Sequence, residues 1–181
     1  MISDSAGQNL FILAFMQELK GDVLEVGSFQ GKSTFFLGTA VKYSQNGKLI
    51  AVDHFKGNKG KEAEYKVKKT NLSDLEDNFK NNIRLAKLDS TVKLINSPND
   101  VAVNSVEDLS LRMLFIDGDH TAQGVRKDIQ LFLPKVKPGG IVVFDDYDSV
   151  HFEGLVKEVN NFIIKKSKKC YPFDRMMVVA L

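Results

Sequence analysis

The chain has 181 residues, of which 43% are hydrophobic and 27% are charged, and this balance suits one globular domain, residues 1–181, with a full-sized core. Its formal net charge of +2 argues neither for nor against nucleic acid, and the single Cys170 excludes an intramolecular disulfide framework and fits a reducing cytoplasm. The most apolar N-terminal run, LFILAFM, is too short to span a membrane and lacks the features of a signal peptide. We therefore expect a cytoplasmic protein with neither a membrane nor a nucleic-acid partner.

The first twenty residues (1–20) predict an N-terminal helix, at about 6–20. Its middle is apolar almost all round, so we expect it to pack on a partner subunit as well as on the rest of the domain. This feature predicts a homodimer.

Short apolar runs then alternate with segments of helical period. The runs are nearly continuous in apolar residues, as in strands buried on both faces, and they lie at 22–26, 48–52, 91–96, 112–116 and 140–144. Three segments between and after them each place their apolar residues on one helical face: Leu72, Leu75, Phe79 and Ile83; Val125, Ile129, Phe132 and Leu133; Leu155, Val159, Phe162 and Ile163. This alternation predicts an α/β fold with a doubly wound, mostly parallel sheet covered by helices on both sides.

Two segments depart from the alternation. The C-terminal KKCYPFDRMMVVAL predicts a short strand, a turn at Pro172–Asp174 and a final strand at 175–181, together a hairpin antiparallel to the sheet edge. The lysine-rich segment 55–70 is interpreted either as a solvated loop and helix face or as a lid over a ligand site, with Gly57 and Gly60 as hinges.

Carboxylates collect where the predicted strands end. Glu25 lies in the first strand, Asp53 follows the second, Asp117 and Asp119 follow the fourth, and Asp145 and Asp146 follow the fifth. Aspartate is also common at strand ends because it starts turns and caps helices. Ligands of open parallel sheets bind outside the carboxyl ends of the strands, so the set as a whole favours a binding site at this edge.

The stretch LEVGSFQGKST, from Leu24 to Thr34, limits what that site binds. It ends like a phosphate-binding loop but has only three residues between its first glycine and the Gly-Lys pair, where four are needed. Phe29 stands where a dinucleotide fingerprint would have its middle glycine, which disfavours NAD. What is left is Glu25, Gly27 and Gly31 around a tight turn, with Asp53 at the spacing of a carboxylate that accepts hydrogen bonds from a ribose. Lys32 is then interpreted as a surface residue.

Four stretches carry a resemblance to a known family: LEVGSFQGKST, AVDHF, LFIDGDHTAQGVRKDI and VKPGGIVVFDDY. Together they resemble the class I S-adenosylmethionine-dependent methyltransferases, and within them the small O-methyltransferases of the catechol and macrolide-sugar type. The resemblance extends from about residue 20 to 181. It implies a Rossmann-like sheet of seven strands whose last strand is antiparallel.

The resemblance also implies a cofactor, S-adenosylmethionine, and residues that bind it. Glu25, Gly27, Ser28 and Gly31 would line its methionine part. Asp53 would hold the ribose hydroxyls, with His54 beside the adenosine. The loop after the third strand would meet the adenine edge through Ser97 or Asn99, and Asp117 would border the same pocket.

A metal and a base follow from the same resemblance. Asp117, Asp145 and Asp146 match its metal-ligand positions, and hard carboxylate oxygens suit Mg²⁺ or a similar divalent cation. Asp119 would point to the opposite side from Asp117. His120 would be the general base that takes the proton of the acceptor hydroxyl, with Asp117 also at the catalytic centre.

The predicted activity is methyl transfer to an oxygen of a small hydroxylated acceptor, assisted by a divalent cation. One alternative keeps the fold and the cofactor, and makes the chain either an N- or C-methyltransferase without metal or a binding protein without transfer activity. A more remote alternative is a nucleotide-binding enzyme of the phosphate-loop type.

Overall fold

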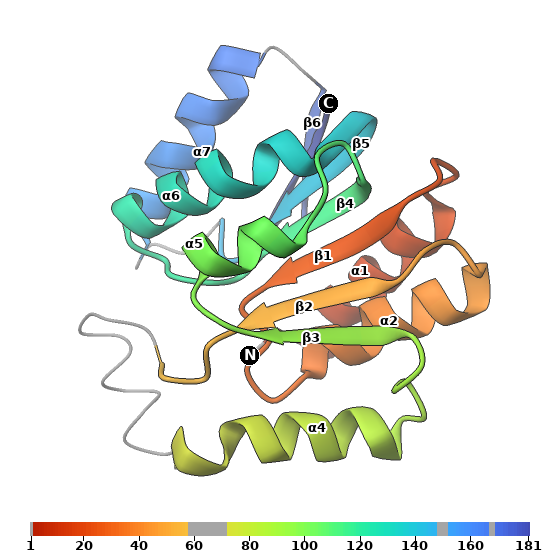
Figure 1. Ribbon diagram of the computed structural model, residues 1–181. Coiled ribbons are helices and arrows are strands. Elements are labelled where there is room, and N and C mark those ends of the chain that lie inside the picture. The colour runs from red at the N-terminus through yellow and green to blue at the C-terminus, as the bar shows by residue number, and fades with distance from the viewer. Residues whose placement is uncertain (1, 58–71, 148–151, 167–168) are drawn as a thin grey trace.

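The computed structural model describes residues 2–57, 72–147, 152–166 and 169–181 (Figure 1). Its strands are β1 (Asp22–Val26), β2 (Leu49–Asp53), β3 (Val92–Asn96), β4 (Leu111–Ile116), β5 (Val136–Phe144), β6 (Cys170–Phe173) and β7 (Met176–Ala180). Its α-helices are α1 (Asp4–Met16), α2 (Lys32–Ser44), α4 (Leu75–Leu85), α5 (Asn99–Ala102), α6 (Ala122–Phe132) and α7 (Glu153–Lys166). Three short 3-10 helices are η1 (Leu72–Asp74), η2 (Val103–Ser105) and η3 (Leu133–Lys135). Among these helices none is long and apolar enough to cross a bilayer.

All seven strands form one sheet in the order β3-β2-β1-β4-β5-β7-β6. The first five strands pair in parallel, and β7 pairs antiparallel to both β5 and β6. The predicted doubly wound, mostly parallel Rossmann-like sheet with an antiparallel last strand is confirmed. The register aligns Val26 with Val52 and with Ile116, and Ile116 with Phe144. Residues that follow β1, β2, β4 and β5 therefore emerge at one edge of the sheet.

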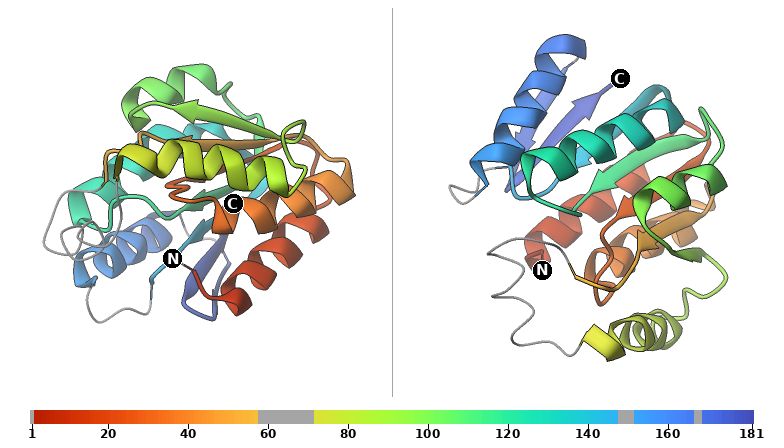
Figure 2. Two further views of the ribbon diagram at one scale, coloured as in Figure 1. Left: turned by 90° about the horizontal axis from the view of Figure 1, so that it is seen from below. Right: turned by 60° about the vertical axis from the view of Figure 1, so that its left-hand side comes forward.

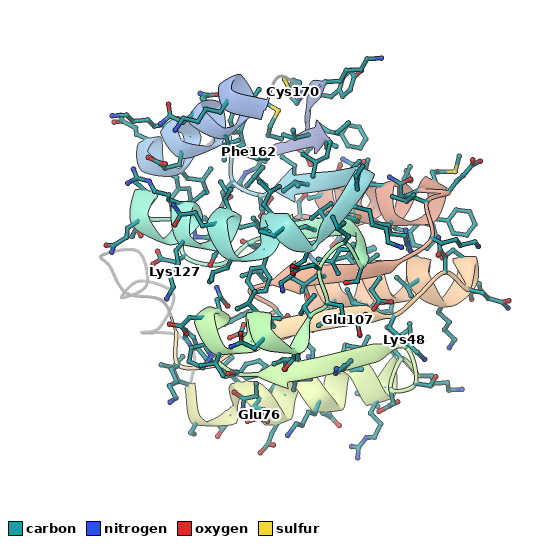
Figure 3. All side chains as sticks on the ribbon, turned by 45° about the horizontal axis from the view of Figure 1, so that its top comes forward. Lys48, Glu76, Glu107, Lys127, Phe162 and Cys170 are labelled. Atoms are coloured by element: carbon teal, nitrogen blue, oxygen red, sulfur yellow. The ribbon has the colours of Figure 1, made fainter. Side chains whose placement is uncertain are left out.

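Side chains of each central strand alternate between two apolar layers. In β4, Met113 packs with Leu10 of α1 and Leu37 of α2, whereas Leu114 packs with Val125 of α6 and Leu155 of α7. Helices α1, α2 and α4 consequently cover one face, and α5, α6 and α7 cover the other (Figure 2). The helical faces predicted from periodicity are the packed faces. Phe162, for example, points from α7 to the sheet, where its ring contacts that of Phe144 edge to face (Figure 3).

Helix α1 is shifted from its predicted range of 6–20 and ends at Met16. Ser3 caps its start by accepting a hydrogen bond from the Ala6 N–H at 2.9 Å. Near its end, the guanidinium of Arg112 donates to the carbonyl oxygens of Ala14, Gly21 and Asn46. Arg112 is fully buried at the amino end of β4, so it holds α1 and two loops together at the edge opposite the site. Sequence periodicity gave no sign of this contact.

Two strand boundaries also differ from the prediction. β5 begins at Val136 rather than at 140, because the Lys137–Gly140 segment continues the strand as a bulge against β4. The predicted turn at Pro172–Asp174 begins too early: Pro172 lies inside β6 and pairs with Met177, and the turn lies at residues 174–175. Proline is tolerated there because β6 is an edge strand.

The predicted lid at 55–70 falls mostly outside the described residues. Within the described part, Phe55 is buried and its ring centroid lies 5.6 Å from that of Phe79 in α4. The start of this segment is thus anchored to the core beside β2.

Candidate functional site

The turn after β1 is built around two close backbone approaches. Gly27 has a φ of +87°, and a Cβ atom there would lie 2.2 Å from the carbonyl oxygen of Asp117. The Gly27 N–H donates to the carbonyl of Val52 at 2.9 Å. Glycine at this position therefore lets the loops after β1, β2 and β4 meet, which brings the predicted site residues to one place.

Gly31 and Lys32 behave differently from residues of a phosphate-binding loop. Gly31 is left-handed at +88° and faces the ring of Phe79, so its missing side chain makes room for α4. Lys32 extends away from the turn, and its Nζ lies 2.7 Å from Asp4 in α1. The interpretation of Lys32 as a surface residue is confirmed, because its side chain is partly exposed and pairs with an exposed aspartate.

Glu25 is a buried carboxylate under that turn. Its Oε2 accepts hydrogen bonds from the hydroxyls of Ser28 at 2.9 Å and Thr34 at 2.5 Å. Its Oε1 is buried and has no hydrogen-bond partner among the described residues. Burial raises the pKa of Glu25 to about 7, although the hydroxyls of Ser33, Thr34 and Ser28 act in the opposite direction. A buried acceptor without a donor is costly unless a ligand supplies one.

The carboxylate of Asp53, at the end of β2, accepts hydrogen bonds from the protein backbone. Its Oδ2 accepts the N–H groups of Ser28 and Phe29 at 2.9 and 2.8 Å, and its Oδ1 accepts the N–H of Phe55 at 2.7 Å. Two carboxylate oxygens offer about four acceptor positions, so one is left for a ligand hydroxyl. Beside it, His54 accepts the Lys56 N–H at its Nδ1.

The loop after β3 meets helix α6. Ser97 is half-buried in this loop, and Asn99 is the first residue of α5. The Asn99 side chain donates to Asp128 Oδ1 at 2.6 Å. The structure places Asn99 by a contact with α6 that the sequence did not predict.

Three side chains converge beyond β4 and β5: Asp117, His120 and Asp146. Each offers one ligand atom, and these atoms all lie within 4.8 Å of one another. His120 Nε2 is 3.3 Å from Asp117 Oδ1 and 3.3 Å from Asp146 Oδ2. Nε2 is buried and, among the described residues, has no hydrogen-bond partner. Such convergence of oxygen and nitrogen atoms without mutual hydrogen bonds suits a shared cation.

Asp145 is buried next to this group without supplying an atom to it. Burial and the negative charge of Asp117 raise the pKa of Asp145 to about 7. Its predicted role as a metal ligand stays a prediction. Asp119 lies apart from the group as expected: its Oδ1 accepts the Thr121 N–H at 2.9 Å and so helps to start α6.

Two residues near the group escaped the sequence analysis. Arg175, in the turn between β6 and β7, forms an ion pair with Asp146 Oδ1. The ring of Phe152 stacks on His120 with centroids 4.5 Å apart. An arginine in a hairpin turn and an aromatic residue before a helix carry no motif, so only the folded chain reveals them.

The site as a whole offers two kinds of chemistry at one sheet edge. Below the turn after β1, Glu25 Oε1 is buried without a hydrogen-bond partner among the described residues, and Asp53 holds the backbone of that turn. On the neighbouring strands, Asp117, His120 and Asp146 converge in a group that could hold a metal ion. The turn that carries Ser28 connects the two halves.

Comparisons with known proteins agree with this arrangement. Residues 24–147 match the model of a family described as a methyltransferase domain. The O-methyltransferase NovP has a similar structure, with a TM-score of 0.81 at 19% identity, covering 99% of this chain and 80% of that one. So does an O-methyltransferase from Bacillus cereus in complex with S-adenosylhomocysteine, with a TM-score of 0.69 at 17% identity, covering 100% and 83%.

Two further proteins are also similar to this chain. TomG from Streptomyces achromogenes, an O-methyltransferase of tomaymycin synthesis in complex with S-adenosylmethionine, has a TM-score of 0.69 at 16% identity, covering 100% of this chain and 81% of that one. An uncharacterized protein of Acanthamoeba polyphaga mimivirus, R132, is 42% identical over 52 residues, which are 29% of this chain and 24% of that protein. The chain thus spans only about a quarter of that relative's length in the alignment.

Proposed function

The chain belongs to the methyltransferase domain family, and from this premise we propose that it moves the methyl group of S-adenosylmethionine to a hydroxyl oxygen of a small acceptor with the help of a divalent cation. One observation carries the proposal: the buried, unpartnered Glu25 Oε1 shares a sheet edge with the convergent Asp117, His120 and Asp146. A carboxylate can attract the methionine ammonium, and a cation site can hold and activate the acceptor oxygen, so the two together suit such a reaction.

The residues present fit the cofactor. Glu25 would favour the methionine ammonium through its negative charge, since a nearby positive charge favours the ionised form of a carboxyl with a raised pKa. The remaining acceptor position of Asp53 would take one ribose hydroxyl. His54, Ser97 and Asn99 would border the adenosine.

The residues present also fit a hard divalent cation. Asp117 and Asp146, whose oxygens converge, would be two of its carboxylate ligands, and Asp145, which supplies no atom to that group in this structure, would have to turn toward it to be the third. Their negative charge and oxygen donors suit Mg²⁺ or Mn²⁺, and such an ion, when bound, makes a hydroxyl oxygen that contacts it easier to deprotonate. Arg175 already balances part of the charge of Asp146.

The transfer itself asks mainly for positioning. S-adenosylmethionine would supply an electrophilic methyl group; the lone pair of the acceptor oxygen would form the new C–O bond, and the C–S bond pair would leave with the sulfur. His120 Nε2 takes the proton that the hydroxyl loses. The stacked Phe152 keeps the imidazole plane fixed. Holding oxygen, carbon and sulfur in line can contribute about 7–11 kcal/mol to catalysis.

A second role for His120 is favoured by its position between the two carboxylate oxygens. As a ligand, it would replace Asp145 in the cation site. Mn²⁺ titration followed by electron paramagnetic resonance separates the two roles. If His120 is the base, His120→Gln keeps the Mn²⁺ affinity and loses turnover, whereas Asp145→Asn weakens Mn²⁺ binding. If His120 is a ligand, His120→Gln weakens Mn²⁺ binding and Asp145→Asn leaves it unchanged.

The activity is tested by transfer of a radioactive methyl group from S-adenosylmethionine to a panel of catechols, phenols and hydroxylated sugars. We expect transfer with Mg²⁺ and a loss of roughly a hundredfold or more with chelator, the magnitude of a single lost electrostatic contact in the transition state. Asp146→Asn should lose transfer, and Asp108→Asn should not, because Asp108 is exposed and pairs with Lys135 away from the site.

Each negative result points to a different conclusion. Transfer to these hydroxyl groups that is insensitive to chelator would contradict the cation, whereas transfer only to amine or carbon acceptors would favour N- or C-methylation. Binding without transfer to any acceptor class would favour a binding protein.

A further inference from the structure

The C-terminal hairpin holds the loop after β5 through one residue. Arg175 lies in the turn between β6 and β7, and its guanidinium donates to Asp146 Oδ1. Its backbone carbonyl also accepts the N–H of Tyr147 at 2.9 Å. Two neighbouring residues that follow β5 are thus bound by the side chain and by the backbone of the same arginine.

The backbone of Asp146 depends on such contacts. Its φ of +54° lies in the left-handed region, which a residue with a side chain adopts only at a cost in free energy. Its side chain is only 10% exposed, so its oxygens need partners from the protein or from a ligand. The two contacts from Arg175 therefore stabilise a conformation that is unfavourable for an aspartate by itself.

The two oxygens of Asp146 have different partners. Oδ1 pairs with Arg175, whereas Oδ2 lies 3.3 Å from His120 Nε2. The same His120 atom lies 3.3 Å from Asp117 Oδ1. A cation held among these three side chains would therefore meet one oxygen of Asp146, because the other oxygen is already bound by the guanidinium.

We propose that Arg175 is a positioning residue that restricts Asp146 to coordination through one oxygen, so that the site selects Mg²⁺ against the larger Ca²⁺. This inference rests on the proposed function, because it concerns the cation of that reaction. Ca²⁺ takes about six to eight oxygens, often both oxygens of one carboxylate, whereas Mg²⁺ demands a near-octahedral set that such two-oxygen binding distorts. The guanidinium removes from the site the additional oxygen that Ca²⁺ would use.

The arginine acts on a cation in two ways that a measurement must separate. Its positive charge weakens the binding of Mg²⁺ and of Ca²⁺ to a similar extent, because both ions carry the same charge. Its contact with Oδ1 affects chiefly an ion that would use both oxygens of Asp146. The ratio of the Ca²⁺ affinity to the Mg²⁺ affinity cancels the first effect and measures the second.

A second arginine supplies a matched control. Arg126 of α6 pairs with Glu158 of α7 through two contacts, of 2.9 and 2.6 Å. Neither residue belongs to the group formed by Asp117, His120 and Asp146. Arg126→Met therefore removes an arginine–carboxylate pair and leaves the cation group intact.

The test is titration of the protein with Mn²⁺ at pH 8, followed by electron paramagnetic resonance, with Mg²⁺ or Ca²⁺ then displacing the bound Mn²⁺. In the wild type, Mg²⁺ should displace Mn²⁺ at least as well as Ca²⁺ does. Arg175→Met keeps an aliphatic side chain without a donor, and it should shift the ratio toward Ca²⁺ by roughly tenfold or more, as for loss of an outer-shell partner. Arg126→Met should leave the ratio unchanged.

A conservative variant separates the contact with Oδ1 from a general loosening of the hairpin. The ammonium of Arg175→Lys can still pair with Oδ1, so the ratio should stay within about threefold of the wild type. The bond from the Tyr147 N–H uses the backbone of residue 175 and is available in each variant. If Arg175→Met does not fold, Arg175→Gln, which is shorter and uncharged, should show the same shift toward Ca²⁺.

The outcomes separate this inference from the proposed function. Absence of Mn²⁺ binding by the wild type would overturn both the cation of the proposed reaction and this inference. Mn²⁺ binding with the same ratio in the wild type and in Arg175→Met, or a wild type that prefers Ca²⁺, would overturn the role of Arg175 alone. An equal shift in Arg126→Met, or a full shift in Arg175→Lys, would assign the effect to general loosening and would also overturn it.

Discussion

The carboxylate of Glu25 is predicted to reduce the stability of the empty protein at neutral and higher pH. It is fully buried, and burial raises its pKa from 4.5 to about 7 in the folded chain. Between these values the unfolded chain releases the proton and the folded chain retains it, so the free energy of unfolding falls as pH rises from about 4.5 to about 7. Above pH 7 the loss is complete and amounts to about 3 kcal/mol.

Replacement of Glu25 by glutamine removes this titration and keeps the shape. The amide oxygen can accept the hydroxyls of Ser28 and Thr34, as Oε2 does now. Glu25→Gln should therefore match the wild type at pH 4.5 and exceed it by up to about 3 kcal/mol at pH 8. The same variant should bind S-adenosylhomocysteine at least about tenfold more weakly at pH 8, because its ammonium loses the opposite charge.

Urea unfolding of both proteins without cofactor, at pH 4.5 and pH 8, measures the difference directly. Other groups with raised pKa values, such as Asp145, contribute equally to both proteins and cancel. Glu107→Gln is the control, because Glu107 is exposed and should give no pH-dependent difference (Figure 3). A Glu25→Gln protein that is less stable at pH 8, or a difference that does not change with pH, would refute the reasoning.

Three further predictions concern the framework. Gly27→Ala should lower the free energy of unfolding by about 2 kcal/mol more than Gly139→Ala. Both glycines have similar positive φ values, +87° and +84°, but of the two only Gly27 has an atom where the new Cβ would lie. Equal losses in urea unfolding would contradict this. Arg112→Ala should lower the free energy of unfolding by about 3 kcal/mol, since it leaves buried carbonyls unpaired, and a loss below about 1 kcal/mol would count against it. The side chains of Phe15 and Met16 on α1 are 42% and 68% exposed, as expected for residues of a dimer interface. Light scattering should show a dimer for the wild type and a monomer for the double variant Phe15→Ser, Met16→Ser. A monomeric wild type would exclude the homodimer.

The fold was predictable because its strands and helices carry different periods. The apolar runs that became β1 and β4 are buried on both faces, and the stripe through Leu75, Phe79 and Ile83 is the packed side of α4. The errors occurred where a long-range contact decides the local structure. Buried Arg112 takes up a carbonyl near the end of α1, and the edge position of β6 tolerates Pro172.

The candidate site was predictable to the extent that residues at strand ends must meet. Glu25, Asp53 and Asp117 lie at one edge because the parallel register aligns their strands. The orientation of side chains at that edge was not predictable. Asp53 accepts three backbone N–H groups, and Arg175 reaches Asp146 from a hairpin turn far along the chain. These contacts depend on how the loops pack, and no local pattern encodes that packing.

The most direct measurement is calorimetric titration of S-adenosylhomocysteine into the wild type and into Asp53→Ala at pH 8. ATP with Mg²⁺ is titrated separately as the alternative ligand. The account predicts one molecule bound per chain at micromolar affinity in the wild type, a loss of roughly tenfold or more in Asp53→Ala, and no heat with ATP. Binding of ATP with no heat from S-adenosylhomocysteine would contradict the central claim.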